Sequence, residues 1–231
     1  SRAVDTGQIG ALMLNREQIQ AVFFDLDGTL MDTDDQAVAD LTQHLKRLHW
    51  PSAQRAARRF LMRSETPMNA FLTLLDILGL DTPFNRLVGW LRRSQRAPDK
   101  PVFAIVEGVH EMLTTLQGRY RLGVITTRGE ADARAFLRQH GLVDVFEILV
   151  TRESVHRLKP HPAPVLHASR ALGLAPEQCV MVGDTTMDIL AARRAGAWAV
   201  AVLCGFGERA ELERAGAHVV LSCTPELTSV L

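Results

Sequence analysis

Short runs of apolar residues recur along the chain, separated by segments with helical periodicity. The runs are almost continuously apolar rather than alternating, which is typical of parallel strands covered on both faces. They span residues 21–24, 122–125, 148–150, 180–182, 199–203 and 219–221. From about residue 105 onward these strands alternate with helical patterns such as Val109, Met112, Leu113 and Leu116. The alternation predicts an α/β fold with a doubly wound, mostly parallel, Rossmann-like sheet.

The stretch from residue 34 to residue 104 has a different pattern. It contains no convincing strand, and apolar residues at helical spacing, such as Val38, Leu41 and Leu45, predict helices. Thr66 and Pro67 fit the N-cap and first position of one of them. We therefore predict an α/β core of residues 1–33 and 105–231, with an all-α unit of residues 34–104 inserted after the first strand.

Polar side chains collect where the predicted strands end. They are Asp25 and Asp27 after the first strand, Thr126 and Thr127 after the second, Lys159 in a loop before a helix, and Asp184 and Asp188 after residues 180–182. In open α/β sheets, ligands bind outside the carboxyl ends of the strands. These residues, although distant in sequence, are expected to meet at one edge of the sheet.

The residue types at this edge indicate phosphoryl chemistry. Several carboxylates at close range repel one another, and a hard divalent cation such as Mg²⁺ reverses that cost because it prefers oxygen ligands. Lys159 and the hydroxyl of Thr126 add a cation and a donor that can stabilise a transferring phosphoryl group. One aspartate can act as a covalent nucleophile, and a second, two residues on, can protonate the leaving oxygen and later activate water.

Four segments carry a family resemblance. They are "DLDGT" at residues 25–29, Thr126 after "GVI", Lys159 in "KPHP", and "GDTTMD" at residues 183–188. In this order they resemble the four motifs of the haloacid dehalogenase superfamily, and the resemblance extends from about residue 20 to residue 221. It implies that the inserted helices are a cap, a lid that closes over small substrates and excludes water.

The resemblance also implies a role for each motif residue. Asp25 is the nucleophile and a metal ligand, and Asp27 is the general acid/base and binds the metal through its backbone carbonyl. Thr126 and Lys159 hold the phosphoryl oxygens, with further phosphate contacts from the backbone around Leu26 and Thr127. Asp184 ligates Mg²⁺ directly or through water, and Asp188 ligates it or lies in its outer shell. By contrast, we expect Asp32 and Asp34 to be solvated charges outside the chemistry.

Asp27, the second aspartate, favours phosphoryl chemistry over dehalogenation. Dehalogenases of the superfamily lack an acid at the position of Asp27, because a halide leaves without a proton, whereas an alkoxide needs one. The tail after residue 202 resembles phosphoglycolate-phosphatase-type members, which points to a small phosphorylated metabolite. Thr127, where many relatives have Asn, and Glu107, where Pro is common, depart from that pattern. The alternatives are a phosphomutase, a pyrophosphatase and a non-catalytic phospho-acceptor domain.

Composition indicates which classes of partner and which cellular location to expect. The net charge is zero, with 26 basic and 26 acidic residues, which disfavours nucleic-acid binding. No apolar segment approaches the length of a membrane span, and the first residues do not resemble a signal peptide. Three cysteines without metal-like spacing indicate reduced thiols and a cytoplasmic protein. We expect a monomer or homodimer, and we expect "GFGE" at residues 205–208 to be a turn without a cofactor.

Overall fold

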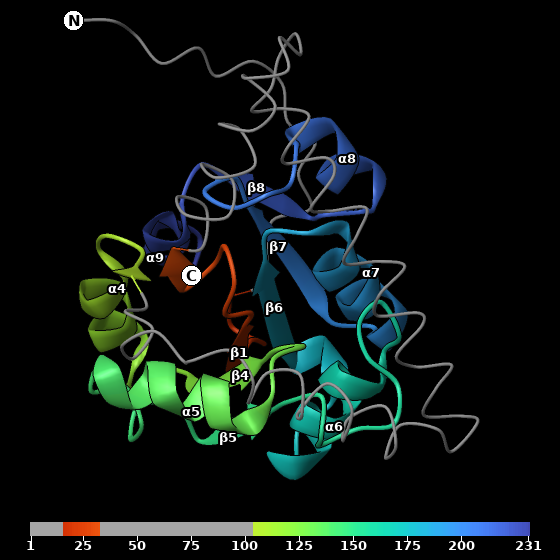
Figure 1. The fold of residues 1–231 in the computed structure, drawn as a ribbon. Helices are drawn as coiled ribbons and strands as arrows, with labels where there is room; N and C mark the ends of the chain where they lie inside the picture. Colours follow the sequence, from red (N-terminus) through yellow and green to blue (C-terminus); the bar gives the residue numbers. More distant parts are fainter. Residues whose placement is uncertain (1–15, 33–103) are drawn as a thin grey trace, which may run out of the picture.

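The computed structural model describes residues 16–32 and 104–231. In this part of the chain six parallel strands form one sheet in the order β5-β4-β1-β6-β7-β8 (Figure 1). The strands are β1 (Ala21–Phe24), β4 (Arg121–Ile125), β5 (Ile148–Val150), β6 (Cys179–Gly183), β7 (Trp198–Val202) and β8 (Val219–Leu221). The predicted doubly wound parallel sheet is confirmed, and β7 lies one residue earlier than predicted.

Helices cover both faces of the sheet (Figure 1). One layer contains α4 (Val109–Leu116), α5 (Glu130–Gln139) and α9 (Leu227–Val230), and the other contains α6 (Ala163–Ala171), α7 (Thr186–Ala195) and α8 (Arg209–Arg214). Two short 3₁₀ turns, η1 (Pro176–Gln178) and η2 (Thr224–Glu226), also lie in this part of the chain. Side chains of β1 alternate between the layers: Phe24 packs with α4 and α5, and Phe23 with α6 and α7.

The order of the strands places β1 at the switch point of the sheet. The chain pairs β4 on one side of β1 and later returns to pair β6 on the other side. Phe24 is in register with Val124 of β4 and Val182 of β6, so the three strands end side by side. A crevice at the carboxyl ends of such strands is where α/β sheets bind ligands.

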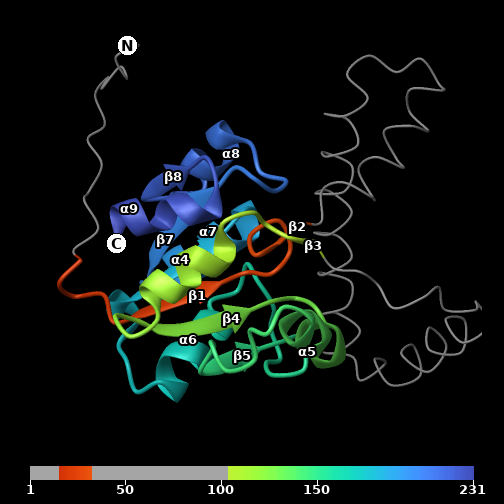
Figure 2. The same cartoon turned by 90° about the vertical axis from the view of Figure 1, so that its left-hand side faces the viewer.

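A small antiparallel pair lies beyond the carboxyl end of β1 (Figure 2). It joins β2 (Met31–Asp32) to β3 (Ala104–Ile105), with Met31 opposite Ile105. The chain therefore leaves and re-enters the described core at adjacent points. The predicted helical cap at 34–104 falls almost wholly outside the described residues, so the division into core and cap stays a prediction. Among the described helices, none has both the length and the apolarity to cross a membrane.

Candidate active site

Four charged residues from separate segments meet at the carboxyl edge of the sheet. Asp25 follows β1, Asp184 follows β6, Asp188 lies in the first turn of α7, and Lys159 comes from the loop between β5 and α6. All four are buried, and Asp184 and Asp188 are fully inaccessible to solvent. The structure therefore brings these residues together as predicted. They form a charged cluster inside a hydrophobic core.

Lys159 lies at the centre of this cluster. Its Nζ is 2.8 Å from Oδ1 of Asp25 and 2.6 Å from Oδ1 of Asp188, and it donates a third bond of 3.1 Å to the carbonyl of Ile125. An ammonium group has three hydrogens to donate, so all three are used. One ammonium thus bridges a carboxylate on β1 and a carboxylate on α7.

The cluster holds more negative than positive charge. Burial lowers the pKa of Lys159, but the attraction of Asp188 and Asp25 outweighs it and the pKa rises above its usual value. Burial raises the pKa of Asp25 to about 7, against the opposing attraction of Lys159. Burial and the charges of Asp188 and Asp25 likewise raise the pKa of Asp184 well above its usual range. The pKa values of the two acids are therefore raised mainly by burial, and that of the lysine by its two carboxylate partners.

The loop after β7 contacts the side chain of Asp184. Its Oδ2 accepts a 2.7 Å hydrogen bond from the backbone amide of Phe206. A Cβ atom at Gly205 would lie 2.1 Å from the same Oδ2, so the loop approaches this closely only because residue 205 is glycine. The other oxygen, Oδ1, is buried and has no hydrogen-bond partner among the described residues. An unpartnered buried carboxylate oxygen is costly, and a bound cation would remove that cost.

The start of α7 holds Asp188. Its Oδ2 accepts 2.7 Å and 3.1 Å hydrogen bonds from the hydroxyl and amide of Thr185, the N-cap residue of the helix. Since Oδ1 accepts from Lys159, both oxygens of Asp188 are engaged. Oxygen atoms of Asp25, Asp184 and Asp188 nevertheless all lie within 4.8 Å of one another, close enough to share one metal ion. The helix cap and the charged cluster therefore use the same side chain.

Asp27 and Thr126 lie beside the cluster rather than in it. Asp27 is half-buried and forms a two-pronged ion pair with Arg128, at 2.7 Å and 2.6 Å. Thr126 is buried, and its Oγ1 accepts a 3.1 Å hydrogen bond from the amide of Arg128. The Thr126 hydroxyl hydrogen therefore remains available to a ligand. The segment after β4 thus supplies a donor to the site and a cationic partner to Asp27.

The remaining predicted residues shape the turn and the rim. Leu26 is buried, and its carbonyl accepts hydrogen bonds from the amides of Thr29, Leu30 and Met31, which closes a tight turn directly after the first carboxylate. Thr127 is half-buried and lies two residues after the end of β4. Asp32 is exposed, as predicted, whereas Asp34 falls outside the described residues.

Three contributors to the site were missed in the sequence. The T-x-x-D spacing of Thr185 and Asp188 is a capping pattern that could have been recognised. Arg128 had a weaker signal, its position two residues after a strand-end threonine. The amide of Phe206 had none, because a backbone donor carries no side-chain signature and "GFGE" was expected to be an ordinary turn.

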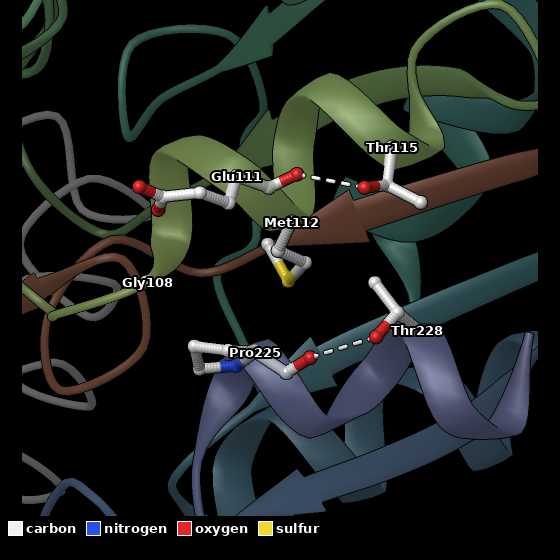
Figure 3. A pocket seen from close by; sticks show the side chains of 6 residues that line it. All are labelled: Gly108, Glu111, Met112, Thr115, Pro225 and Thr228. Atoms are coloured by element: carbon white, nitrogen blue, oxygen red, sulfur yellow. Dashed lines mark hydrogen bonds between the residues drawn. The ribbon is translucent and has the colours of Figure 1, made fainter.

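A separate pocket lies between α4 and the η2–α9 segment (Figure 3). Its volume is about 310 Å³, and its lining residues are Gly108, Glu111, Met112, Thr115, Pro225 and Thr228. The hydroxyls of Thr115 and Thr228 donate to backbone carbonyls of their own segments, at 2.9 Å and 3.2 Å. Glu111 is the one charged residue among the six. This pocket shares no residue with the carboxylate cluster and has no constellation that suggests chemistry.

Comparison with known proteins places this geometry among phosphate-handling hydrolases. The family described as haloacid dehalogenase-like hydrolase matches residues 22–202. A protein of Dickeya dadantii named probable phosphatase IndB is 33% identical, covering 89% of this chain and 90% of its own. A pyrophosphatase PpaX of Halalkalibacterium halodurans is 28% identical over 93% and 97% of the two chains. A phosphoglycolate phosphatase of Nitrosospira multiformis is 29% identical over 92% and 96%.

A solved structure agrees with these sequence matches. A HAD family hydrolase from Deinococcus radiodurans, crystallised with bound phosphate and sodium, superposes with a TM-score of 0.65. It is 26% identical and covers 91% of this chain and 93% of its own. The fold described here therefore resembles that of a hydrolase whose crystal structure contains bound phosphate and sodium.

Proposed function

The chain belongs to the haloacid dehalogenase-like hydrolases and is a phosphatase, and from this premise we propose that it hydrolyses a small phosphomonoester of the phosphoglycolate type through an aspartyl-phosphate on Asp25. The observation that carries the proposal is the buried cluster in which Lys159 bridges Asp25 and Asp188, 2.8 Å and 2.6 Å away, with Asp184 alongside. Such a cluster is expensive to bury, and a phosphoryl group with a cation is the ligand that it suits.

Mg²⁺ is the cofactor that we propose for this cluster. The donors are carboxylate oxygens, which hard divalent cations prefer. The buried Oδ1 of Asp184, which has no hydrogen-bond partner among the described residues, supports a cation at this cluster. Asp25 and Asp184 would hold the ion, together with the backbone carbonyl of Asp27, and Asp188 would support it from the capped start of α7. When bound, the ion supplies positive charge that stabilises the phosphoryl oxygens.

The protein's own residues would carry out the two steps. In the first step, a carboxylate oxygen of Asp25 attacks phosphorus, the bond to the leaving oxygen breaks, and Asp27 gives that oxygen a proton. In the second, Asp27 takes a proton from water, the water oxygen attacks phosphorus, and Asp25 is released together with inorganic phosphate. The Thr126 hydroxyl would donate to a phosphoryl oxygen, and the backbone near Leu26 and Thr127 would add donors. The Lys159 ammonium would stabilise the phosphoryl charge, and to donate to a phosphoryl oxygen it would exchange one of its three present acceptors.

The names of the relatives and the general acid support this substrate class. An alkoxide leaving group needs the proton that Asp27 can give, which fits a phosphomonoester of a small metabolite. Relatives with a phosphoglycolate phosphatase name make phosphoglycolate the first substrate to test. Relatives with a pyrophosphatase name make inorganic pyrophosphate the second. A phosphomutase would instead return the phosphoryl group to a sugar, and its product would be an isomerised sugar phosphate.

Phosphate release by the purified protein tests the proposal. We expect Mg²⁺-dependent release from phosphoglycolate, and we expect the Asp25→Asn variant to lose turnover by at least about a thousandfold while its circular dichroism spectrum stays unchanged. A panel of sugar phosphates and pyrophosphate, assayed in the same way, would rank the substrates. Mg²⁺-dependent hydrolysis that persisted in Asp25→Asn would refute the aspartyl-phosphate mechanism.

A further inference from the structure

Arg128 holds the carboxylate of Asp27 through two parallel hydrogen bonds. Nε of Arg128 donates to Oδ2 of Asp27 at 2.7 Å, and Nη2 donates to Oδ1 at 2.6 Å. The two side chains are 29% and 23% exposed, whereas those of the Arg134–Glu130 pair are 49% and 53% exposed. A partly buried two-pronged pair is both stronger and more directional than a surface pair.

This fork of hydrogen bonds leaves the carboxyl group free to react. Each carboxylate oxygen offers two acceptor positions, and each oxygen of Asp27 uses one of them for Arg128. The second position of either oxygen stays available to carry a proton to a leaving group or to accept one from water. Asp27 can therefore act as acid and as base while it remains bound to the arginine.

The carboxyl group of Asp27 needs this fork, because the backbone does not set its direction. The backbone lies in the turn after β1, where the amide of Gly28 donates to the carbonyl of Met31 at 2.9 Å. That turn leaves the side-chain torsions of Asp27 open. The carboxylate of Asp25 repels that of Asp27, whose charge is one of the causes that raise the pKa of Asp25. Without the fork, repulsion would turn the Asp27 carboxylate away from the nucleophile.

Arg128 is also tied to the site through its backbone. Its amide donates to Oγ1 of Thr126 at 3.1 Å, so the hydroxyl hydrogen of Thr126 points elsewhere. The two contacts can be separated, because a substitution of the arginine side chain removes the fork and keeps the amide. An effect of such a substitution is therefore not due to a lost contact with Thr126.

We propose that Arg128 is a positioning residue, whose fork aims one oxygen of the Asp27 carboxyl group at the leaving oxygen of the substrate. The inference rests on the proposed function, in which Asp27 is the general acid, and adds the residue that orients this acid. A general acid contributes most when the leaving oxygen is strongly basic, and little when that oxygen departs as a stable anion. Loss of orientation should therefore cost more for basic leaving groups, whereas a merely structural role would cost the same for all.

Three substrates with different leaving oxygens test this gradient. Phosphoglycolate releases an alkoxide, phenyl phosphate a less basic phenoxide, and 4-nitrophenyl phosphate a phenoxide that is stable without a proton. We expect Arg128→Met to lower kcat/KM by about tenfold to a hundredfold for phosphoglycolate, less for phenyl phosphate, and by less than about threefold for 4-nitrophenyl phosphate. Neither phenyl ester carries a charge beyond its phosphate, so a gradient between them reflects the leaving oxygen.

Arg134→Met is the matched control, because Arg134 is an exposed arginine of α5 that pairs with Glu130 one helical turn away. It should leave kcat/KM within about twofold for all three substrates. Arg128→Lys keeps the charge without the fork and should show a smaller loss with the same gradient, which also serves the test if Arg128→Met does not fold. Equal losses on all three substrates in the Arg128 variants would overturn the inference and reduce Arg128 to a structural partner of Asp27.

The Asp27→Asn variant separates this inference from the proposed function. We expect it to show a steeper gradient over the three substrates, and we expect Arg128→Met to add less than about twofold in that background, because an absent acid cannot be oriented. Equal losses in Asp27→Asn on all three substrates would show that Asp27 is not the general acid, and the proposed mechanism would fail together with the inference. A gradient in Asp27→Asn, combined with fully additive losses in the double variant, would overturn the role of Arg128 while the proposed function stands.

Discussion

At the scale of single residues, the charge balance of the site depends on Lys159. It is the one cation in direct contact with Asp25 and Asp188 among the described residues, and all three of its hydrogens are donated. Without it, three buried carboxylates would face one another with no compensating charge. We therefore expect Lys159 to stabilise the metal-free protein as well as the phosphoryl group. Unfolding measurements without metal test the first role separately from activity.

We expect Lys159→Met to lower the free energy of unfolding of the metal-free protein by about 3 to 5 kcal/mol, because it leaves buried charges without a partner. Urea unfolding in the presence of a chelator measures this. A second variant, Lys159→Met combined with Asp188→Asn, removes one negative charge as well and should recover part of the loss. If Lys159→Met were as stable as the wild type, the ion pairs would have no net effect on folding.

The pH dependence of the metal-free protein follows from Asp25. Its pKa rises from 3.8 to about 7 on folding, so between these values the folded state binds more protons than the unfolded state. The free energy of unfolding therefore decreases as pH rises from about 4 to about 7, by roughly 4 kcal/mol for this group, and changes no further above that. Asp184 acts in the same direction.

Mg²⁺ should reverse this trend, because it binds the deprotonated carboxylates. We expect saturating Mg²⁺ to raise the free energy of unfolding more at about pH 8 than at about pH 5, measured by urea unfolding at both pH values with Mg²⁺ or chelator. Ca²⁺ is a useful comparison, since it prefers more ligands at longer distances. Equal stabilisation at the two pH values would mean that the ion binds elsewhere.

The site residues could be predicted from sequence to the extent that their position follows from strand ends. Asp25, Asp184 and Lys159 were placed together because parallel strands end at one edge, and the structure brings them together. Arg128 was not, because its contact with Asp27 depends on the direction that a long side chain takes toward the neighbouring segment. The Phe206 amide depends on the path of a loop, which no pattern of side chains records.

At the scale of elements, α7 connects helix capping to the chemistry. Thr185 is its N-cap residue, and the hydroxyl and amide of Thr185 both donate to Oδ2 of Asp188. The remaining oxygen of Asp188 faces Lys159 at 2.6 Å. The start of the helix therefore sets the orientation of the carboxylate that pairs with Lys159.

Thr185→Val removes the hydroxyl donor and keeps the shape of the side chain. We expect it to lower kcat/KM by about tenfold, as the loss of an outer-shell partner does at metal sites, and to cost about 1 kcal/mol of stability as a lost N-cap. Thr185→Ser keeps the hydroxyl and is the control. Steady-state kinetics with urea unfolding measures both effects, and equal losses in the Val and Ser variants would show that the hydroxyl is unimportant.

Element boundaries were predicted well wherever the chain is apolar and regular. Helix α4 begins and ends at the predicted Val109 and Leu116, and its stop at Gly118 agrees with a positive φ of 88° there. Shorter elements were missed, because a two-residue strand such as β2 has no periodicity. Its pairing with β3 also joins residues far apart in sequence, which a local pattern cannot reveal.

At the scale of the whole molecule, the sheet separates two layers with different tasks. The layer of α6, α7 and α8 borders the loop of Lys159 and carries Asp188. The layer of α4, α5 and α9 packs on the opposite face, where Leu116 is fully buried. A doubly wound sheet was predictable from the alternation of patterns. The strand order was not, because it depends on pairing between segments rather than on the segments themselves.

This division predicts different outcomes for substitutions in the two layers. Leu116→Ala on α4 should cost about 2 to 5 kcal/mol of stability with no change in kcat, because the side chain lies far from the charged cluster in the fold. Ile189→Val on α7 should lower the free energy of unfolding by about 0.5 to 1.5 kcal/mol. It should also lower kcat severalfold, because Ile189 is fully buried and follows Asp188 in the helix.

Since Leu116 and Ile189 lie on opposite faces of the sheet, the stability losses of Leu116→Ala and Ile189→Val should add to within about 0.5 kcal/mol in the double variant. Denaturant unfolding of the four proteins measures the additivity, and steady-state kinetics on the same samples measures kcat. A coupling well above that limit would show that the layers act as one packed unit. A fall in kcat caused by Leu116→Ala would show the same, because it would mean that packing on the far face of the sheet sets the position of the charged cluster.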